Sequence, residues 1–282
     1  MAPLACPTEA QWYAHWGEAT RRAEDPAALA ALGGAAADRL AWVFVSGYQA
    51  AVRHCFPEFP DQGWTCFAAA ESERSPGCTL TEADGHALLN GTKSWIAGAG
   101  SVDHLVVSIG QDESMEFVAV ERTAPGVTIE LPRTPTFLAE MNQGVAHFDQ
   151  VSIAPDRRLQ APLRRHWFRA AEPLFILIAL NACIAAHARG LASHAAGSVP
   201  AMASAAAVAA EADATAAQGR GLAVTIPDRT RIKAALADYR LKTAAVVSSF
   251  EKIVLAQTPH ALQDSWRKDG RLLAMFGVAA PG

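Results

Sequence analysis

The segment N-G-T-K-S-W-I-A-G-A-G, residues 90–100, determines how the rest of the chain is interpreted. It joins an Asn-Gly pair and a lysine to a tryptophan, and then continues with small side chains. Asn-Gly predicts a hairpin turn, because both central residues of a type I′ turn need positive φ. Two explanations of Trp95 stay open: the indole fills the core of a sheet, or it forms a wall beside a flat ligand that approaches the strand.

The surrounding residues, from about 64 to 160, form short segments of strand-like periodicity separated by Gly, Asp and Pro. This pattern predicts an antiparallel, barrel-like β domain. The sequence on both sides of it has helical periodicity. We therefore expect an α+β protein with three parts: an N-terminal helical segment (1–62), a middle β domain (63–162) and a C-terminal helical domain (163–282).

Several residues predict where helices begin and end. Asp25, followed by a proline, is expected to cap a helix that ends at Gly33-Gly34. Residues 168–197 predict one long apolar helix. Thr258, also followed by a proline, is expected to cap the last helix.

Composition excludes several classes of protein. The chain has 282 residues and a net charge of −4, which favours neither nucleic acid nor an anionic membrane as a partner. The longest apolar stretch, 174–188, contains Asn181 and predicts a buried helix rather than a membrane span. The first seven residues lack the pattern of a signal peptide. Five scattered cysteines without a C-x-x-C pair predict free thiols, a cytoplasmic location and no metal site.

Two sequence blocks resemble the middle domain of the acyl-CoA dehydrogenase family of flavoproteins. Residues 88–108, L-L-N-G-T-K-S-W-I-A-G-A-G-S-V-D-H-L-V-V-S, are similar to the family pattern l-x-G-x-K-x-W-I-T-x-a-x-x-A-D-x-x-v-V. Residues 145–159, V-A-H-F-D-Q-V-S-I-A-P-D-R-R-L, are similar to v-x-F-d-x-V-x-V-P-x-x-x-l. Both blocks occur in the family's order between helical segments. The resemblance implies the family's fold, with a C-terminal helical bundle after the β domain.

The resemblance also implies a cofactor, a substrate and an assembly. It implies FAD, with the Trp95 indole covering one side of the isoalloxazine and the backbone of Ile96 and Ala97 meeting the edge of the ring. Ala70 and Ser75 belong to a loop that contacts the flavin in the family. The implied reaction is oxidation of a CH–CH bond in acyl-CoA or a related thioester. Association through the C-terminal helices implies a homodimer or a larger homo-oligomer.

The chain departs from the family pattern at two hydroxyl positions. Ala97 stands where the family has a threonine that faces the flavin. The family loop T-E-x-x-x-G-S-D is matched by F-A-A-A-E-S-E-R-S-P-G, residues 67–77, in which Ala70 replaces the threonine and Glu71 keeps the acid. Ser75 is the nearest match for the serine. Each missing hydrogen bond is worth about 0.5–1.5 kcal/mol of cofactor binding.

Two further features of the family are not found in the sequence. The Arg-x-x-Phe-Gly and Gln-x-x-Gly-Gly segments that hold the dinucleotide are missing, which leaves only generic phosphate candidates: Arg189, Arg220, Arg229 and Arg231. Family members place a catalytic glutamate either late in the helical domain or on its first long helix. Glu172 is the only acid on that helix here, and no catalytic base is assigned from the sequence.

Three functions therefore stay open. The first is an FAD-dependent oxidoreductase that acts on an acyl thioester. The second is a flavin-dependent monooxygenase of the same fold, which needs no thioester base. The third is a non-catalytic subunit, favoured by the missing hydroxyls and phosphate-binding segments. The preserved Lys93-x-Trp95-Ile96 block favours a flavoprotein among these.

Overall fold

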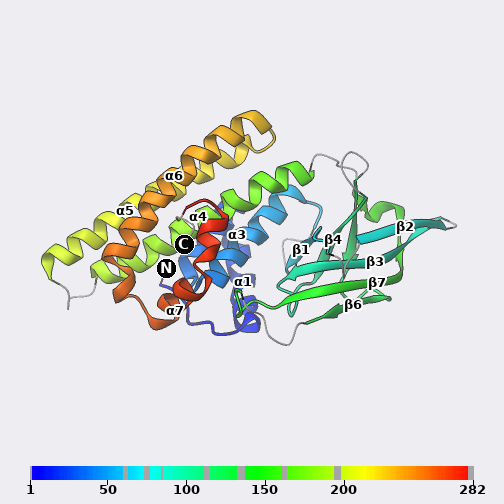
Figure 1. The fold of residues 1–282 in the computed structure, drawn as a ribbon, viewed down its shortest axis with the longest axis horizontal. Helices are drawn as coiled ribbons and strands as arrows, with labels where there is room; N and C mark the ends of the chain where they lie inside the picture. Colours follow the sequence, from blue (N-terminus) through cyan, green and yellow to red (C-terminus); the bar gives the residue numbers. More distant parts are fainter. Residues whose placement is uncertain are drawn as a thin grey trace.

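The computed structural model describes residues 2–59, 63–72, 77–83, 85–110, 115–131, 137–159, 164–193 and 198–278. Its helices and strands follow the order expected from the sequence, with helices first, then strands, then helices (Figure 1). The helices are α1 Glu9–Arg22, α2 Pro26–Ala36, α3 Leu40–Cys55, α4 Arg164–Ser193, α5 Val199–Leu222, α6 Arg229–Ile253, α7 His260–Asp269 and α8 Arg271–Met275. The strands are β1 Thr65–Ala68, β2 Gly77–Ala83, β3 His86–Ala97, β4 His104–Ile109, β5 Glu116–Glu121, β6 Val127–Glu130, β7 Gln143–Ile153 and β8 Arg158–Leu159.

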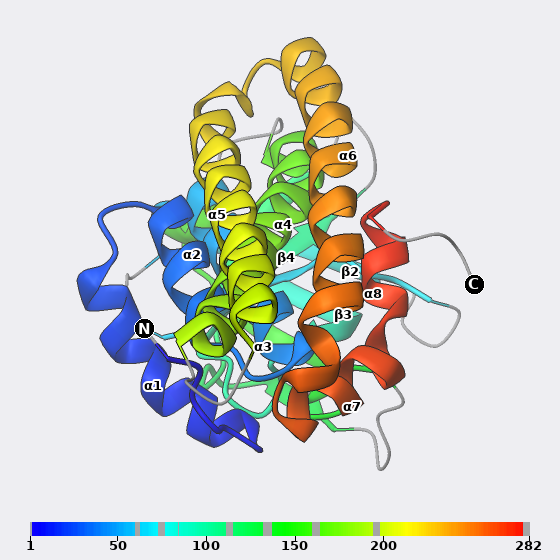
Figure 2. The ribbon, with the colours of Figure 1, turned by 90° about the vertical axis from the view of Figure 1, so that its left-hand side faces the viewer.

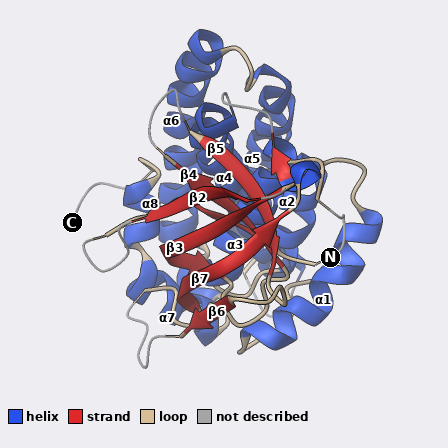
Figure 3. Cartoon of the chain, turned by 90° about the vertical axis from the view of Figure 1, so that its right-hand side faces the viewer, coloured by secondary structure: helices blue, strands red, loops and turns tan. Residues whose placement is uncertain are grey.

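The strands form two sheets, with the orders β1-β4-β5-β8 and β2-β3-β7-β6. Figure 3 shows these strands on one side of the molecule with the helices behind them. The predicted α+β class is confirmed, with two differences in detail. The described strands do not close into a barrel, and β1 pairs with β4 in parallel. The parallel pair arises because the chain leaves the first sheet after β1, builds β2 and β3 in the other sheet, and then returns.

The helices on both sides of the β region pack into one body. α2 and α3 lie against α4, and Figure 2 shows α5 and α6 covering the other side of α4. The division of the chain at residues 62 and 162 stays a proposal. α4 is long and apolar enough to span a membrane, but 83% of its most apolar window is buried inside the protein. The predicted buried helix at 174–188 is confirmed, and α4 is the centre of the helical body.

The start of α2 is as predicted, but its end is not. The Asp25 carboxylate accepts a hydrogen bond from the Ala28 N–H at 2.6 Å, which caps the helix. Gly33 and Gly34 do not end α2, which continues to Ala36. A Cβ at Gly34 would lie 2.1 Å from the carbonyl oxygen of Ala179, so this glycine allows α2 to approach α4 closely.

The predicted hairpin at Asn90-Gly91 is wrong. Both residues lie inside β3, at a shift in its register with β7. β2 and β3 are instead joined next to Gly85, which has a φ of 75°. Gly91 is required by a close approach, because a Cβ there would lie 2.2 Å from the carbonyl oxygen of Gly77. The Asn90 side chain accepts a hydrogen bond from the backbone N–H of Gln150 at 2.9 Å.

The helix predicted after Thr258 begins one residue later than expected. α7 starts at His260, with Pro259 in the capping position. The Thr258 hydroxyl does not cap this helix and donates instead to the carbonyl of Leu255 at 2.7 Å. α7 is anchored to the helical body, since the Ser265 hydroxyl accepts a hydrogen bond from the Leu40 N–H at 2.7 Å.

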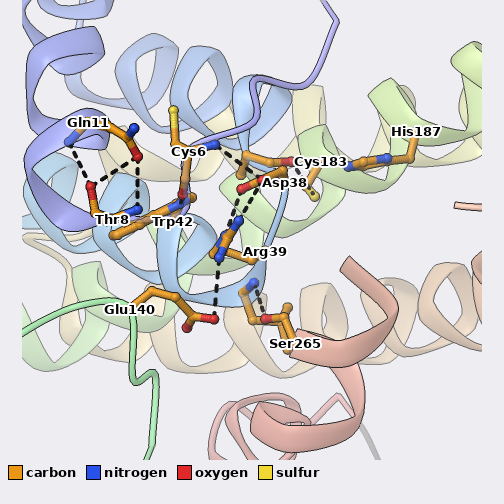
Figure 4. Close-up of polar contacts among 12 residues, drawn as sticks. Cys6, Thr8, Gln11, Asp38, Arg39, Trp42, Glu140, Cys183, His187 and Ser265 are labelled. Atoms are coloured by element: carbon orange, nitrogen blue, oxygen red, sulfur yellow. Dashed lines mark hydrogen bonds and ion pairs between the residues drawn. The ribbon is translucent and has the colours of Figure 1, made fainter. Parts of the chain in front are cut away.

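A buried polar cluster joins the N-terminus, the helical body and the β region (Figure 4). The Asp38 carboxylate accepts from the guanidinium of Arg39 at 2.8 and 2.9 Å and from the backbone N–H of Cys6 at 3.3 Å. Arg39 also contacts Glu140, which precedes β7, at 3.4 Å. The indole of Trp42 donates to the Cys6 carbonyl at 2.7 Å. These contacts hold the segment that precedes α1 against the start of α3.

We expect Gly34→Ala to destabilise the protein, because its Cβ would overlap the backbone of α4. Overpacking of this kind costs about 1–3 kcal/mol or more. Gly221→Ala is the matched control, since no atom lies within 4 Å of a Cβ at that helical position. It is expected to leave the free energy of unfolding unchanged or to raise it by about 0.5–1 kcal/mol. Urea unfolding followed by circular dichroism measures both, and equal midpoints for Gly34→Ala and the parent chain would contradict the close packing.

Candidate functional site

A buried ion pair fixes the start of the candidate site. Lys93 on β3 is fully buried, and its Nζ donates to Glu71 Oε1 at 2.5 Å and to the Ser108 hydroxyl at 3.2 Å. The Glu71 side chain is 34% exposed. The backbone N–H of Ser94 donates to the carbonyl of Ala70 at 3.0 Å. These bonds tie the residues after β1 to the middle of β3.

Trp95 lies in a β-bulge. Between Lys93 and Ile96, β3 advances three residues while β7 advances two. Trp95 has a φ of 57°, which is unusual for a bulky side chain and costs of order 1–3 kcal/mol. The bulge turns the indole out of the sheet, so that it is only partly buried and meets the Phe44 ring edge-on at 5.6 Å. Neither sequence-based explanation anticipated this contact with α3.

The predicted cofactor residues lie in two different environments. Ala70 is exposed and Trp95 is partly exposed, next to the bridge between Ala70 and Ser94. Ile96 and Ala97 are buried and paired with β7, and the Ala97 amide also interacts with the Cys66 thiol. Ser75 lies outside the described residues. The exposed ledge therefore consists of Ala70, Ser94 and Trp95, and the roles of Ile96, Ala97 and Ser75 as cofactor contacts stay predictions.

An aromatic cluster extends from this ledge into the helical body. Phe44 and Tyr48 of α3 stack with ring centroids 5.4 Å apart. Tyr48 meets Phe168 of α4 edge-on at 5.7 Å, and Phe168 lies 4.7 Å from Phe67 of β1. The Tyr48 hydroxyl accepts the Phe67 N–H at 2.9 Å. The cluster thus joins α3, α4, β1 and β3 where helices and sheets meet.

Glu172 is the one acid of α4 and lies beside this cluster. It follows Phe168 by one helical turn, so both side chains are on the same face of α4. Its charge acts on both Tyr48 and Cys66, which places the carboxyl between α3 and β1. Burial raises the pKa of Glu172 to about 7, and the carboxyl makes no hydrogen bond or ion pair with another described residue. A carboxyl group in such an environment is a candidate proton acceptor near neutral pH.

The sequence contained one signal for this residue. Glu172 is the only acid in a long apolar helix, and because burial of a lone acid is unfavourable, such a residue either reaches solvent or serves a function. The sequence did not show which face of α4 carries it, because the helix is apolar on nearly all sides. The contacts of Phe168 supply that information.

The remaining sequence candidates do not gather at this site. Arg189 forms an ion pair with Asp213 on α5. Arg220 and Arg231 are exposed, and nothing is described of the Arg229 side chain. All five cysteines are buried and unpaired, as predicted. In the described part of the chain, no group of three or more His, Cys, Asp or Glu side chains is arranged to hold a metal ion.

Comparison with solved structures identifies the fold. An FAD-dependent dehydrogenase superposes with a TM-score of 0.61 at 13% identity, over 98% of each chain. FMN-bound TdsC from Paenibacillus sp. A11-2 gives 0.67 at 15% identity, over 95% of this chain and 88% of that one. The prolyl acyl carrier protein oxidase AnaB gives 0.59 at 11% identity, over 95% and 90%. The chain therefore has the acyl-CoA dehydrogenase-like fold. No protein-family model and no curated protein sequence matches it.

We expect the two partners of the buried ion pair to differ in mutational cost. Glu71→Gln leaves the fully buried Lys93 ammonium without its counter-charge and is expected to cost about 3 kcal/mol. Lys93→Met leaves a carboxylate that water reaches and is expected to cost about 1 kcal/mol. Glu82→Gln, which removes an exposed partner of Arg158, is the control and should change stability by less than about 1 kcal/mol. Chemical unfolding measures all three, and the opposite order for the first two would contradict the assignment.

We expect Glu172 to make the protein less stable as pH rises. Its pKa is about 7 in the folded chain and about 4.5 when unfolded, so the unfolded state releases the proton first. The free energy of unfolding therefore falls between about pH 4.5 and pH 7, by about 3 kcal/mol in all, and is level above that range. Glu172→Gln removes this loss and is expected to be more stable than the parent at pH 8. Urea unfolding at pH 5, 6, 7 and 8 measures the difference, and parallel pH profiles would show that Glu172 is ionised throughout.

Proposed function

We propose that the chain is a flavin-dependent oxidoreductase that oxidises a CH–CH bond of an acyl thioester, with Glu172 as its base. The observation that carries this proposal is the Glu172 carboxyl, which is largely desolvated, has no counter-charge among the described residues and lies beside the aromatic cluster that ends at Trp95. A base whose pKa is near the working pH is most effective in general base catalysis. The shared fold adds support but does not by itself imply the activity.

The ledge at Trp95 fits one face of a planar ring. The partly exposed indole offers an apolar wall, and the small side chains of Ala70 and Ser94 leave space beside it. The Ser94 side chain is partly exposed, and within the described part of the chain its hydroxyl makes no hydrogen bond, so we propose that it bonds the ligand. The strained backbone of Trp95 is further support, because such strain occurs most often at functional sites. We propose that these three residues hold the flavin ring.

The proposed chemistry divides between the cofactor and the protein. A flavin held at the ledge by Trp95, Ser94 and Ala70 would supply an acceptor for the hydride of the thioester β-carbon. Glu172 removes the α-proton, so that the two C–H bonding pairs become one hydride and one C=C bond. The aromatic cluster of Phe67, Phe168 and Tyr48 lies beside this carboxyl, and desolvation by the surrounding protein keeps the carboxyl protonated until the pH approaches 7. Substrate binding completes the enclosure.

The substrate class and the assembly remain part of the proposal. AnaB is a prolyl acyl carrier protein oxidase, and its similarity supports a thioester carried on coenzyme A or on a carrier protein. Homodimerisation through the C-terminal helices is proposed from the resemblance, and a cytoplasmic location is proposed from the five free cysteines.

A second candidate is a flavin-dependent monooxygenase. A TdsC structure that contains FMN and indole superposes with a TM-score of 0.68 at 17% identity. A function of this kind needs the ledge at Trp95 but no base for a thioester. The two candidates therefore differ in how they depend on Glu172.

We expect the purified protein to retain FAD or FMN with a shifted visible absorption spectrum after excess flavin is removed. Trp95→Ala should weaken flavin binding by about tenfold, because stacking of a ring on an aromatic side chain contributes about 1–3 kcal/mol. Met275→Ala removes an exposed apolar side chain of α8 that belongs neither to the ledge nor to the aromatic cluster, and it serves as the control. A protein that retains neither flavin would exclude both enzyme functions and leave the non-catalytic subunit.

With flavin bound, we expect acyl-CoA thioesters to bleach the flavin under anaerobic conditions. Glu172→Gln should slow this step by at least about a hundredfold while flavin binding is unchanged. Glu211→Gln, which removes an exposed acid of α5, should behave like the parent. Unchanged bleaching in Glu172→Gln would exclude this residue as the base. Bleaching by NADH with oxygen consumption, in place of bleaching by thioesters, would favour the monooxygenase.

A further inference from the structure

A cationic pocket lies between the start of α4 and the first half of α6, and none of its lining residues belongs to the Trp95 ledge. It has a volume of about 430 Å³ and lies in the helical body. The cationic and potentially cationic side chains that line it are His166 and Arg169 from α4 and Lys233 and Arg240 from α6. No carboxylate is among its described lining residues, although the whole chain has a net charge of −4. The local balance of charge therefore favours an anion.

The nearest carboxylates of α6 are engaged elsewhere. Asp228 caps α6 and accepts the Arg231 N–H at 3.0 Å. Asp238 pairs with Lys242 at 3.0 Å. Within the described part of the chain, none of the four lining cations has an ion pair with an acid.

Arg240 has an unpaired donor at this pocket. Its Nε is shielded from solvent and has no hydrogen-bond partner among the described residues. A buried N–H without a partner is costly, and an acceptor that enters the pocket removes this cost. Guanidinium groups bind phosphate oxygens with two parallel hydrogen bonds, which makes arginine well suited to this ligand.

The ends of two helices add to the positive potential. His166 and Arg169 lie in the first two turns of α4, and Lys233 lies in the second turn of α6. The N-terminal ends of helices carry partial positive charge and attract phosphates. Both helices are long, with 30 and 25 residues, and both start next to the pocket.

The rest of the pocket wall is apolar and contains an indole. Trp167 is only partly buried and lies among the lining residues with Ile226, Pro227 and Leu236. Inorganic phosphate alone would leave this wall in contact with water. A ligand that carries both a phosphate and a flat base satisfies both parts, and the volume lies within the range of small-molecule sites.

We propose that this pocket binds a nucleotide, with its phosphates on Arg169, Lys233 and Arg240 and its base against Trp167. The pocket differs from the candidate active site in its residues, because neither Phe168 nor Glu172 is among its lining residues. The proposal does not rest on the proposed oxidation.

Isothermal titration of the purified 282-residue protein with ADP tests the proposal. We expect ADP to bind more tightly than either adenosine or inorganic phosphate, with an affinity that falls as salt is raised. Lys233→Gln and Arg240→Gln should each weaken ADP binding by about tenfold, and Trp167→Leu should weaken adenosine and ADP alike. Lys252→Gln removes the same charge from the far end of α6 and should bind ADP like the parent. Lys233 is exposed, so its substitution leaves the fold intact even where that of Arg240 does not.

The same titration with FAD and coenzyme A distinguishes which molecule carries the bound nucleotide, because both contain the ADP group. Weaker binding of FAD, but not of FMN, in Lys233→Gln would assign the pocket to the flavin dinucleotide. Weaker binding of coenzyme A, but not of FAD, would assign it to the substrate carrier. A free nucleotide is the source if ADP alone responds. Two results would overturn the proposal. The first is that ADP does not bind at 1 mM, which is about the lower limit of useful affinity. The second is that Lys233→Gln, Lys252→Gln and the parent bind ADP equally.

Discussion

The close approach of α2 and α3 to α4 is the constraint on which the rest of the structure depends. Gly34 and Gly47 bring the backbones of α2 and α3 against α4, and a Cβ at either position would lie 2.1 or 2.3 Å from atoms of Ala179 and Ile176. This contact buries the apolar middle of α4. It also brings α3 close enough for Tyr48 to meet Phe168 and for Phe44 to meet Trp95. The geometry of the candidate site therefore depends on these two glycines, because any side chain at either position would push the helices apart.

The sequence predicted the order of the elements because that order depends on local periodicity and on turn residues. The prediction from sequence failed at residues whose identity is required by contact with a distant part of the chain. Gly33-Gly34 has the composition of a helix end, and Asn90-Gly91 has that of a turn. Gly34 and Gly91 each face a backbone atom of another segment, so tertiary contact determines their conformation. A neighbouring turn at Gly85 removes the need for one at Gly91.

The candidate site was predictable only in part, for the same reason. The Lys93-x-Trp95 block lies on the strand that carries the ledge, and the partly exposed position of Trp95 depends on a bulge that periodicity does not reveal. Ile96 and Ala97 follow in the same motif but return to the sheet, where both are buried. Glu172 lies 77 residues further along the chain, and only the packing of α4 shows that it belongs to the same junction.

The side chains of α4 lie in different environments, because different parts of the helix contact different elements. Its middle is buried without charge, which is favourable for a helix packed on all sides. Near its start, one face places Glu172 among aromatic rings, where burial disfavours the carboxylate, and another face places Arg169 at an open pocket. Burial of a lone carboxyl costs stability at neutral pH, and nothing in the packing of α4 requires an acid there. A residue that lowers stability without a structural partner is best explained by a role in binding or catalysis, and the large apolar contact of α4 is what makes that cost tolerable.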